Sequence, residues 1–189
     1  MVQITDRTNE LISDLNEKLK ENCPDLQLTV FPYGVDVKLC LLLNNDECVS
    51  YLTITDYNGT FNILSRTNDT YQGKGYNKFL TAVSIYLADT MTEYDELYSS
   101  TSVEARIHIL SEYEHRLEKD EEDDYGYGSS NFFVPIYENK NKAEEIMTKW
   151  INNKCVKANV GGKKTRGDKQ RRKSQIRKSK KRKTKRKRN

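Results

Sequence analysis

The sequence of 189 residues lacks an apolar run long enough to cross a membrane, and its first residues lack the basic and apolar regions of a signal peptide. It is also poor in cysteine. Cys23, Cys40, Cys48 and Cys155 show no CxxC spacing of the kind found in zinc and redox sites. Because Cys40 and Cys48 lie in apolar runs, we expect them to be buried thiols. These absences favour an intracellular, soluble protein.

Features of a metal site are scarce. The sequence has two histidines and no HExxH motif. Glu104, His108, Glu112 and His115 follow one another at spacings of 4, 4 and 3 on one predicted helix, so they could share a face and offer ligands. The rest of that segment is rich in charge, and a solvated face with local ion pairs accounts for the same pattern. We therefore predict no metal site.

Acidic residues are almost missing from the C-terminal segment. Residues 157–189 contain 18 lysines and arginines but one acidic residue, Asp168, which gives a net charge of +17. Residues 1–156 contain 14 basic and 27 acidic residues, a net charge of −13. The modest overall charge of +4 therefore hides two segments of opposite sign.

The basic segment also lacks the apolar residues that a fold needs. From Gly161 onward its one aliphatic residue is Ile176, which cannot offset the entropy lost on ordering. We expect a folded domain over residues 1–155 and a disordered Lys/Arg-rich tail over residues 156–189. Such a tail is typical of a nuclear-import signal, of a nucleic-acid-binding arm, or of both. It has no Phe, Tyr or Trp, so binding should be non-specific.

One segment has the pattern of a phosphate-binding turn. Residues 71–77 read Tyr-Gln-Gly-Lys-Gly-Tyr-Asn, and they lie between a strand-like run, residues 60–66, and an amphipathic helix that begins at Tyr76. A glycine turn that leads into a helix presents free amide groups at the positive end of the helix dipole. The segment is not a P-loop, because Lys74 is followed by Gly75, and it does not match the GxGxxG dinucleotide motif.

The pattern Gln72-x-x-Gly75-x-Asn77 resembles the Q/R-x-x-G-x-G/A acetyl-CoA signature of the GNAT superfamily of N-acetyltransferases. Asn77 departs from that signature, because the family has Gly or Ala at the last position. A side chain at this place either crowds the pyrophosphate or donates a hydrogen bond to it.

The order of expected elements is also similar to that of the GNAT superfamily. The sequence predicts a helix over residues 6–22, three strands at 26–31, 35–43 and 48–56, the motif strand and helix, a short strand at 96–100, a helix opened by Ser102, a strand at 131–137 and a helix at 143–152. The resemblance implies an α/β (α+β) fold with a central, mostly antiparallel sheet flanked by helices. One clear strand is found at the C-terminal end, where the family usually has a hairpin.

The resemblance implies acyl transfer from acetyl-CoA to an amine. Its pyrophosphate cradle would comprise Gln72, Gly73, Lys74, Gly75, Tyr76 and Asn77, and its pantetheine would pair with Ile63, Leu64 and Ser65. A backbone N–H of that strand would then stabilise the oxyanion. Replacing Gly75 by Trp should close this cradle and leave the fold intact, because the turn lies at the surface end of the helix.

The catalytic residues implied by the resemblance are less well marked. An amine with an unperturbed pKa of about 10.4 needs a base, and proximity suggests Asp56, Asp69 or Glu96. The family's tyrosine acid would fall at Ile109, so Tyr113, one turn later, is the candidate.

A second hypothesis places the function in the tail. The chain would then be a non-catalytic nucleic-acid-binding or virion-packaged protein. The richness in Asn, Lys and Tyr, together with the basic tail, resembles proteins of large double-stranded DNA viruses. The expected location is intracellular: the nucleus, or the host cytoplasm and the virion for a viral protein. Binding of acetyl-CoA by a chain that ends near Cys155 separates the two hypotheses.

Overall fold

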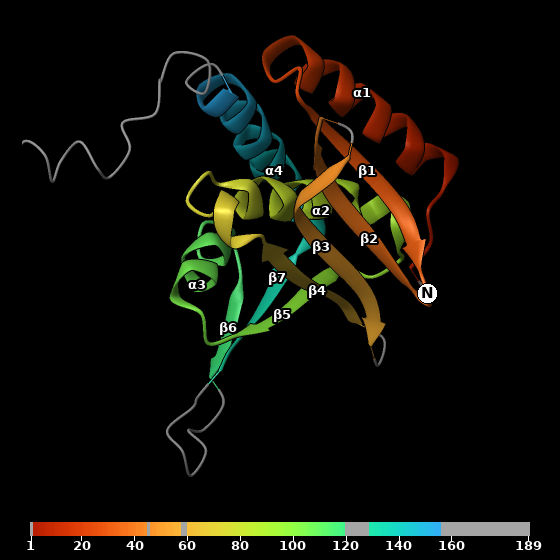
Figure 1. Cartoon of the computed structure of the whole chain (residues 1–189). Helices are drawn as coiled ribbons and strands as arrows, with labels where there is room; N and C mark the ends of the chain where they lie inside the picture. Colours follow the sequence, from red (N-terminus) through yellow and green to blue (C-terminus); the bar gives the residue numbers. More distant parts are fainter. Residues whose placement is uncertain (1, 45, 58–59, 120–128, 156–189) are drawn as a thin grey trace, which may run out of the picture. The chain divides into compact units, whose positions relative to one another are not determined.

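The computed structural model describes residues 2–44, 46–57, 60–119 and 129–155. Its elements follow the order α1 (Asp6–Asn22), β1 (Leu26–Tyr33), β2 (Asp36–Leu43), β3 (Glu47–Tyr57), β4 (Thr60–Thr67), η1 (Asp69–Tyr71), α2 (Tyr76–Met91), β5 (Glu96–Thr101), α3 (Glu104–Leu110), β6 (Arg116–Lys119), β7 (Ser130–Pro135), α4 (Ile136–Trp150) and η2 (Ile151–Cys155) (Figure 1). The seven strands form one sheet in the order β1-β2-β3-β4-β5-β7-β6.

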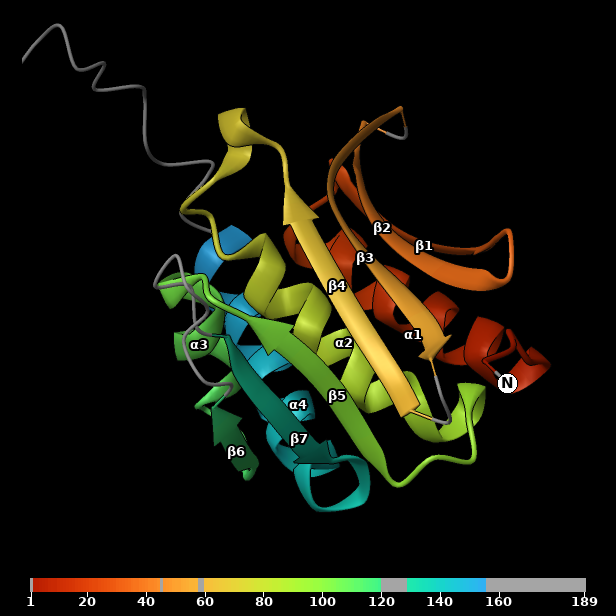
Figure 2. The ribbon, with the colours of Figure 1, turned by 90° about the horizontal axis from the view of Figure 1, so that it is seen from below.

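The sheet is mostly antiparallel, and β4 and β5 are its parallel pair. Figure 2 shows the sheet in front of α1, α2 and α4, so these three helices cover one of its faces. The core lies between the two layers, and its fully buried aromatic side chains are Phe61, Phe79 and Phe132. The expected fold class is therefore confirmed.

The sequence determines α1 closely. Thr5 caps the helix by accepting a hydrogen bond from the amide of Thr8, and the Thr8 side chain accepts one from the amide of Thr5. The apolar residues at helical spacing are buried: Leu11, Ile12, Leu15 and Leu19. The helix ends at Asn22, two residues before Pro24, as predicted.

The pairing of β2 with β3 corrects the prediction of buried thiols. These antiparallel strands bring together two cysteines that lie eight residues apart, and Cys40 and Cys48 form a disulfide with a Cα–Cα distance of 6.0 Å. Cys23 is disulfide-bonded as well. Cysteine spacing in the sequence gave no sign of this, because cross-strand neighbours are set by the register of the strands.

The C-terminal part also differs from the prediction. A second strand, β6, pairs antiparallel with β7 and completes the hairpin that the sequence did not reveal. Its four residues, Arg-Leu-Glu-Lys, are too short and too charged to show a strand pattern. Glu118 and Lys119 open an acidic run, residues 118–124, whose charge favours an exposed loop, yet both belong to this strand; residues 120–124 lie outside the described part. The last helix begins at Ile136, earlier than expected.

Within the described ranges, none of the helices is long and apolar enough to span a membrane, and no group of three or more candidate metal ligands occurs. The four residues considered as metal ligands do not share one helix, because α3 ends at Leu110. Glu112 instead forms an ion pair with Lys78, and the ring of His115 lies 5.1 Å from that of Phe132.

Candidate functional site

Strand β4 has two different edges. Along one edge it pairs with β3 at eight positions, from Thr60 to Thr67. Along the other it pairs with β5 at two positions, Phe61 with Leu97 and Asn62 with Tyr98. Figure 2 shows the two strands diverging from there. The second half of β4, which holds the predicted pantetheine residues, therefore has no strand paired along this edge; there the Ile63 carbonyl accepts a hydrogen bond from the Ser99 hydroxyl of β5 at 3.3 Å.

Glycines shape the turn between β4 and α2. Gly73 and Gly75 have φ angles of 77° and 81°, a region that favours glycine. Gly75 is the N-cap of α2 and makes no side-chain capping bond. The first amide to bond back in this turn is that of Phe79, which donates to the carbonyl of Gly75 at 3.0 Å. The amides of Tyr76 to Lys78 therefore have no acceptor within the helix.

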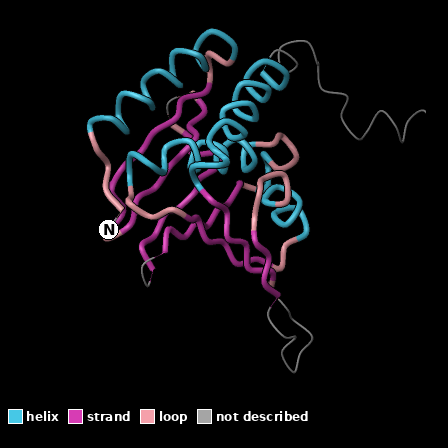
Figure 3. Tube along the Cα trace, turned by 180° about the vertical axis from the view of Figure 1, so that it is seen from behind, coloured by secondary structure: helices cyan, strands magenta, loops and turns pink. Residues whose placement is uncertain are grey.

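Side chains from two other helices support this turn. The indole N–H of Trp150 donates to the carbonyl of Lys74 at 3.3 Å, and the ring stacks on Phe79 with centroids 4.5 Å apart. Figures 1 and 3 both show the loop between β4 and α2 beside α3. The turn is thus held between α3 and α4.

The contact with Trp150 corrects one expectation. A Cβ added to Gly75 would lie 3.0 Å from the indole nitrogen of Trp150, and the backbone at this residue is left-handed. A tryptophan at position 75 would therefore disturb the packing of α4. Gly73, by contrast, has open space where a Cβ would point.

The predicted cradle residues lie together in this turn. Gln72 is exposed, and its side-chain amide donates to Asp69 Oδ1 at 2.7 Å. The ammonium of Lys74 lies 4.8 Å from the ring centroid of Tyr71. Tyr76 is buried, which raises the pKa of its phenol. The turn therefore presents a lysine and unpaired amides together, an arrangement that suits an anion.

Arg106, which the sequence analysis did not single out, bonds both to the first turn of α2 and to strands β4 and β5. One guanidinium nitrogen, Nη1, donates to Ser65 Oγ and, at 3.1 Å, to Asn77 Oδ1. The other, Nη2, lies 3.5 Å from the carbonyl oxygen of Ile63 and 3.4 Å from Ser99 Oγ. A signal was present in the sequence: Arg106 stands four residues before Leu110, on the buried face of α3.

Asp56 and Glu96 lie at the end of the sheet where β4 and β5 are still paired. Asp56 faces Phe61 across the strands and accepts a hydrogen bond from the Tyr94 hydroxyl at 2.9 Å. Glu96 precedes the paired Leu97, and its carboxylate lies 3.7 Å from Arg116. Both carboxylates are thus at the opposite end of β4 from the glycine turn.

Tyr113 lies in the core, 3% exposed, and its hydroxyl has no hydrogen-bond partner among the described residues. Burial, with a smaller contribution from the negative charge of Glu112, raises the pKa of this phenol far above its usual value. Glu112 in turn reaches Lys78 in the first turn of α2. The phenol is therefore a protonated group on the helix side of the sheet.

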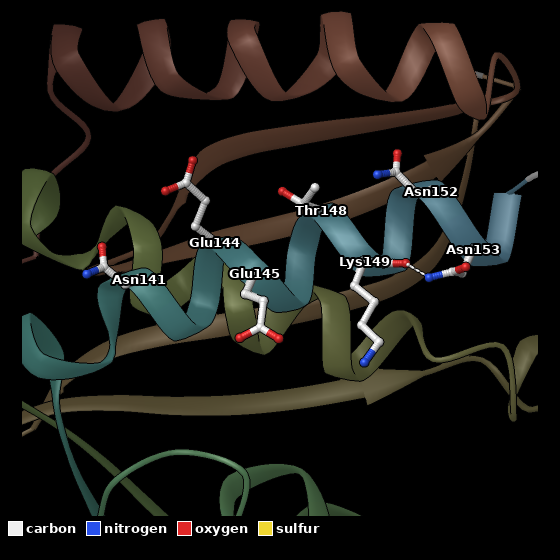
Figure 4. Close-up of a pocket in the computed structure, with 7 residues that line it drawn as sticks. All are labelled: Asn141, Glu144, Glu145, Thr148, Lys149, Asn152 and Asn153. Atoms are coloured by element: carbon white, nitrogen blue, oxygen red, sulfur yellow. Dashed lines mark hydrogen bonds between the residues drawn. The ribbon is translucent and has the colours of Figure 1, made fainter.

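A hollow along α4 lies apart from this turn. It is lined by polar side chains of α4 and η2, among them Glu144, Glu145 and Lys149 (Figure 4). Its lining includes none of the cradle residues. The hollow and the β4–α2 corner are therefore formed by different residues.

Comparisons with known proteins identify the fold. Two mutant forms of the spermidine N-acetyltransferase SpeG from Vibrio cholerae superpose with a TM-score of 0.50 each. One is 12% identical over 69% of this chain and 93% of its own, and the other is 13% identical over 69% and 77%. The chain has the fold of these acetyltransferases. No protein-family model and no curated protein matches the sequence. At such identities the GNAT likeness concerns the fold and leaves activity open.

Proposed function

We propose that residues 1–155 form an acetyl-CoA-dependent N-acetyltransferase domain. The observation that carries the proposal is the corner where β4 leaves β5 after two paired positions and leads through two left-handed glycines into the uncapped α2. The edge of β4 beyond its two pairs with β5 suits the amide groups of pantetheine. An uncapped helix N-terminus with a nearby lysine suits its pyrophosphate.

The residues present fit this cofactor. The space in front of Gly73 allows a phosphate to approach the backbone. Gln72, Lys74, Gly75, Tyr76 and Asn77 would surround the pyrophosphate. On β4, the predicted pantetheine residues differ in exposure, and the pantetheine chain would run along them: Ile63 is buried, Ser65 is half-buried and Leu64 is 68% exposed.

Acetyl-CoA would supply an activated acetyl thioester. Side chains of the protein would remove a proton from the amine and donate one to the leaving thiolate. A positioned base must remove a proton from the attacking amine. Asp56 and Glu96 remain the candidate bases, at the end of β4 remote from the predicted pyrophosphate cradle. Tyr113 is the candidate acid for the departing thiolate, since its raised pKa keeps the phenol protonated at neutral pH.

The charge of the domain favours a cationic acceptor. The net charge of −13 over residues 1–156 would concentrate a polycation near the protein. A polyamine or a lysine-rich peptide therefore suits the acceptor site better than an acidic substrate does.

Acetyl-CoA binding is the direct test. At 100 times the dissociation constant, the ligand should stabilise the full chain by about 2.7 kcal/mol in thermal unfolding. Release of free CoA in the presence of spermidine or a lysine peptide would then report turnover. A thermal midpoint that acetyl-CoA does not change would refute the proposal.

Asn77→Asp supplies a matched variant. A carboxylate in the first turn of α2 would favour the helix dipole and pair with Arg106, so stability should be retained or raised by about 0.3–1 kcal/mol. The same charge would repel pyrophosphate and weaken acetyl-CoA binding. Asn141→Asp, on the exposed side of α4, makes the same change away from the cradle and should leave binding unaltered.

For residues 156–189 we propose non-specific nucleic-acid binding, with nuclear import as a second use of the same charges. The support is the net charge of +17 over residues 157–189. Affinity for unrelated DNA duplexes should fall with salt, with a slope of about −0.9 per phosphate contacted. Truncation after residue 155 should abolish it. An affinity that salt does not change would contradict this proposal, and DNA binding without any acetyl-CoA binding would favour a non-catalytic protein.

A further inference from the structure

Arg106 is buried in an unusual place for a cation. The residue is 7% exposed, and its guanidinium reaches from α3 to Ile63 of β4 and Ser99 of β5, where these two strands are no longer paired. An arginine has five N–H donors in a rigid fork and stays charged at physiological pH. Four protein groups receive its hydrogen bonds: Ser65, Asn77, Ser99 and the carbonyl of Ile63.

All four of these groups are neutral. Among the described residues, no carboxylate forms an ion pair with Arg106. Removing a charge from water is costly unless an opposite charge compensates it. Burial accordingly lowers the pKa of the guanidinium to about 10. Four of its five donors have protein partners, but the positive charge itself has no counter-ion among the described residues.

The position of the guanidinium adds a second unfavourable term. Asn77, one of its partners, lies in the first turn of α2, and the N-terminus of a helix carries a partial positive charge. A cation is disfavoured there for the same reason that an anion is favoured. Two positive groups thus converge on one spot, and an anion placed between them would relieve both.

We propose that Arg106 is an anion-binding residue at the place where β4 and β5 separate, beside Ser65 and Asn77, and that it holds the pyrophosphate of an acyl-CoA. The inference rests on the proposed function. The two ends of the fork differ in a way that fits this role. Nη2 is anchored to the buried Ile63 and Ser99, whereas Nη1 faces Ser65 and Asn77, which are half-buried. Phosphate oxygens would replace these two partners of Nη1.

The test is isothermal titration of the full chain with CoA and with dephospho-CoA, which keeps the pyrophosphate and lacks the 3′-phosphate. Arg106→Met removes the charge and keeps an apolar stem, and we expect it to weaken binding of both ligands by roughly 10- to 100-fold. Arg106→Lys keeps the charge without the fork, and it should give a smaller loss. Arg7→Met removes an exposed charge from α1 and should change neither affinity.

Three results would overturn the inference. If Arg106→Met binds CoA as tightly as the wild type or more tightly, the Arg106 side chain only fills space between β4 and β5 and does not bind the ligand. If the loss occurs with CoA but not with dephospho-CoA, Arg106 holds the 3′-phosphate. If the wild type binds neither ligand, the proposed function itself fails and the inference falls with it. Arg106→Lys carries the test should the methionine variant not fold.

Discussion

The two edges of β4 show how one strand can serve both stability and binding. The edge toward β3 is paired along its whole length, whereas the edge toward β5 is paired at Phe61 and Asn62 alone. Phe61 is fully buried, but Leu64, three residues later, is 68% exposed. The paired edge holds the strand in place, whereas at the other edge the Ile63 carbonyl accepts from the side chains of Ser99 and Arg106 instead of from a strand.

The N-termini of α1 and α2 differ in the same way. Thr5 and Thr8 satisfy each other's amides at α1, and the Thr5 hydroxyl also donates to the carbonyl of Thr90 at 2.9 Å. Gly75, at α2, has no side chain with which to cap. A capped terminus gives stability, whereas an uncapped one leaves amide groups for a ligand. Because α3 and α4 also begin without a side-chain cap, the missing cap marks α2 only together with the two left-handed glycines that precede it.

The largest effect should come from the paired end of β4. Phe61→Ala removes a fully buried ring, so we expect it to lower the free energy of unfolding by about 3–5 kcal/mol. Chemical denaturation measures this change. A loss below about 1 kcal/mol would mean that this end of the strand is not the rigid part of the sheet.

The two glycines of the turn should differ. Gly73→Ala meets open space and should cost about 1–2 kcal/mol, because its left-handed backbone disfavours a side chain. Gly75→Ala adds the close approach to Trp150 and should cost more. Thermal unfolding of both variants gives the comparison. Equal losses would show that Trp150 moves aside freely.

Tyr113→Phe should have a small and opposite effect on stability. It removes a buried hydroxyl without a described partner, so we expect the free energy of unfolding to rise by about 0–1 kcal/mol. In the wild type the raised pKa means that the folded state keeps its proton where the unfolded state loses it, and stability falls as the pH rises above about 10. The variant should lose less stability over that range.

Activity provides the second measurement for this variant. If Tyr113 is the acid, Tyr113→Phe should slow acetyl transfer while the protein becomes no less stable. Unchanged turnover would remove Tyr113 from the mechanism.

The smallest effect on stability is expected at the unpaired edge. Leu64→Ala alters an exposed side chain, so its unfolding free energy should stay within about 0.5 kcal/mol of the wild type. Acetyl-CoA affinity should nevertheless fall, because Leu64 would cover the pantetheine chain. Titration against the wild type checks this, and an unaltered affinity would place the pantetheine elsewhere.

Local patterns in the sequence predicted much of the corner and of the fold. The strand over residues 60–66 is β4 with one further residue, the helix begins at Tyr76 as expected, and the mostly antiparallel sheet is confirmed. These features depend on neighbours in the chain: alternation in a strand, helical spacing of apolar residues and glycines in a turn. The cofactor and catalytic roles of the named residues stay predictions.

The sequence by itself determined that β4, a glycine turn and α2 follow one another, because each depends on residues a few positions apart. The tertiary structure alone decided what surrounds them. It paired Cys40 with Cys48, set Trp150 against Gly75, and brought Arg106 from α3 to Ser65 and Asn77. These contacts join residues that are 8, 75, 41 and 29 positions apart. Strand register and helix packing fix such distances, and neither leaves a periodic pattern in the sequence.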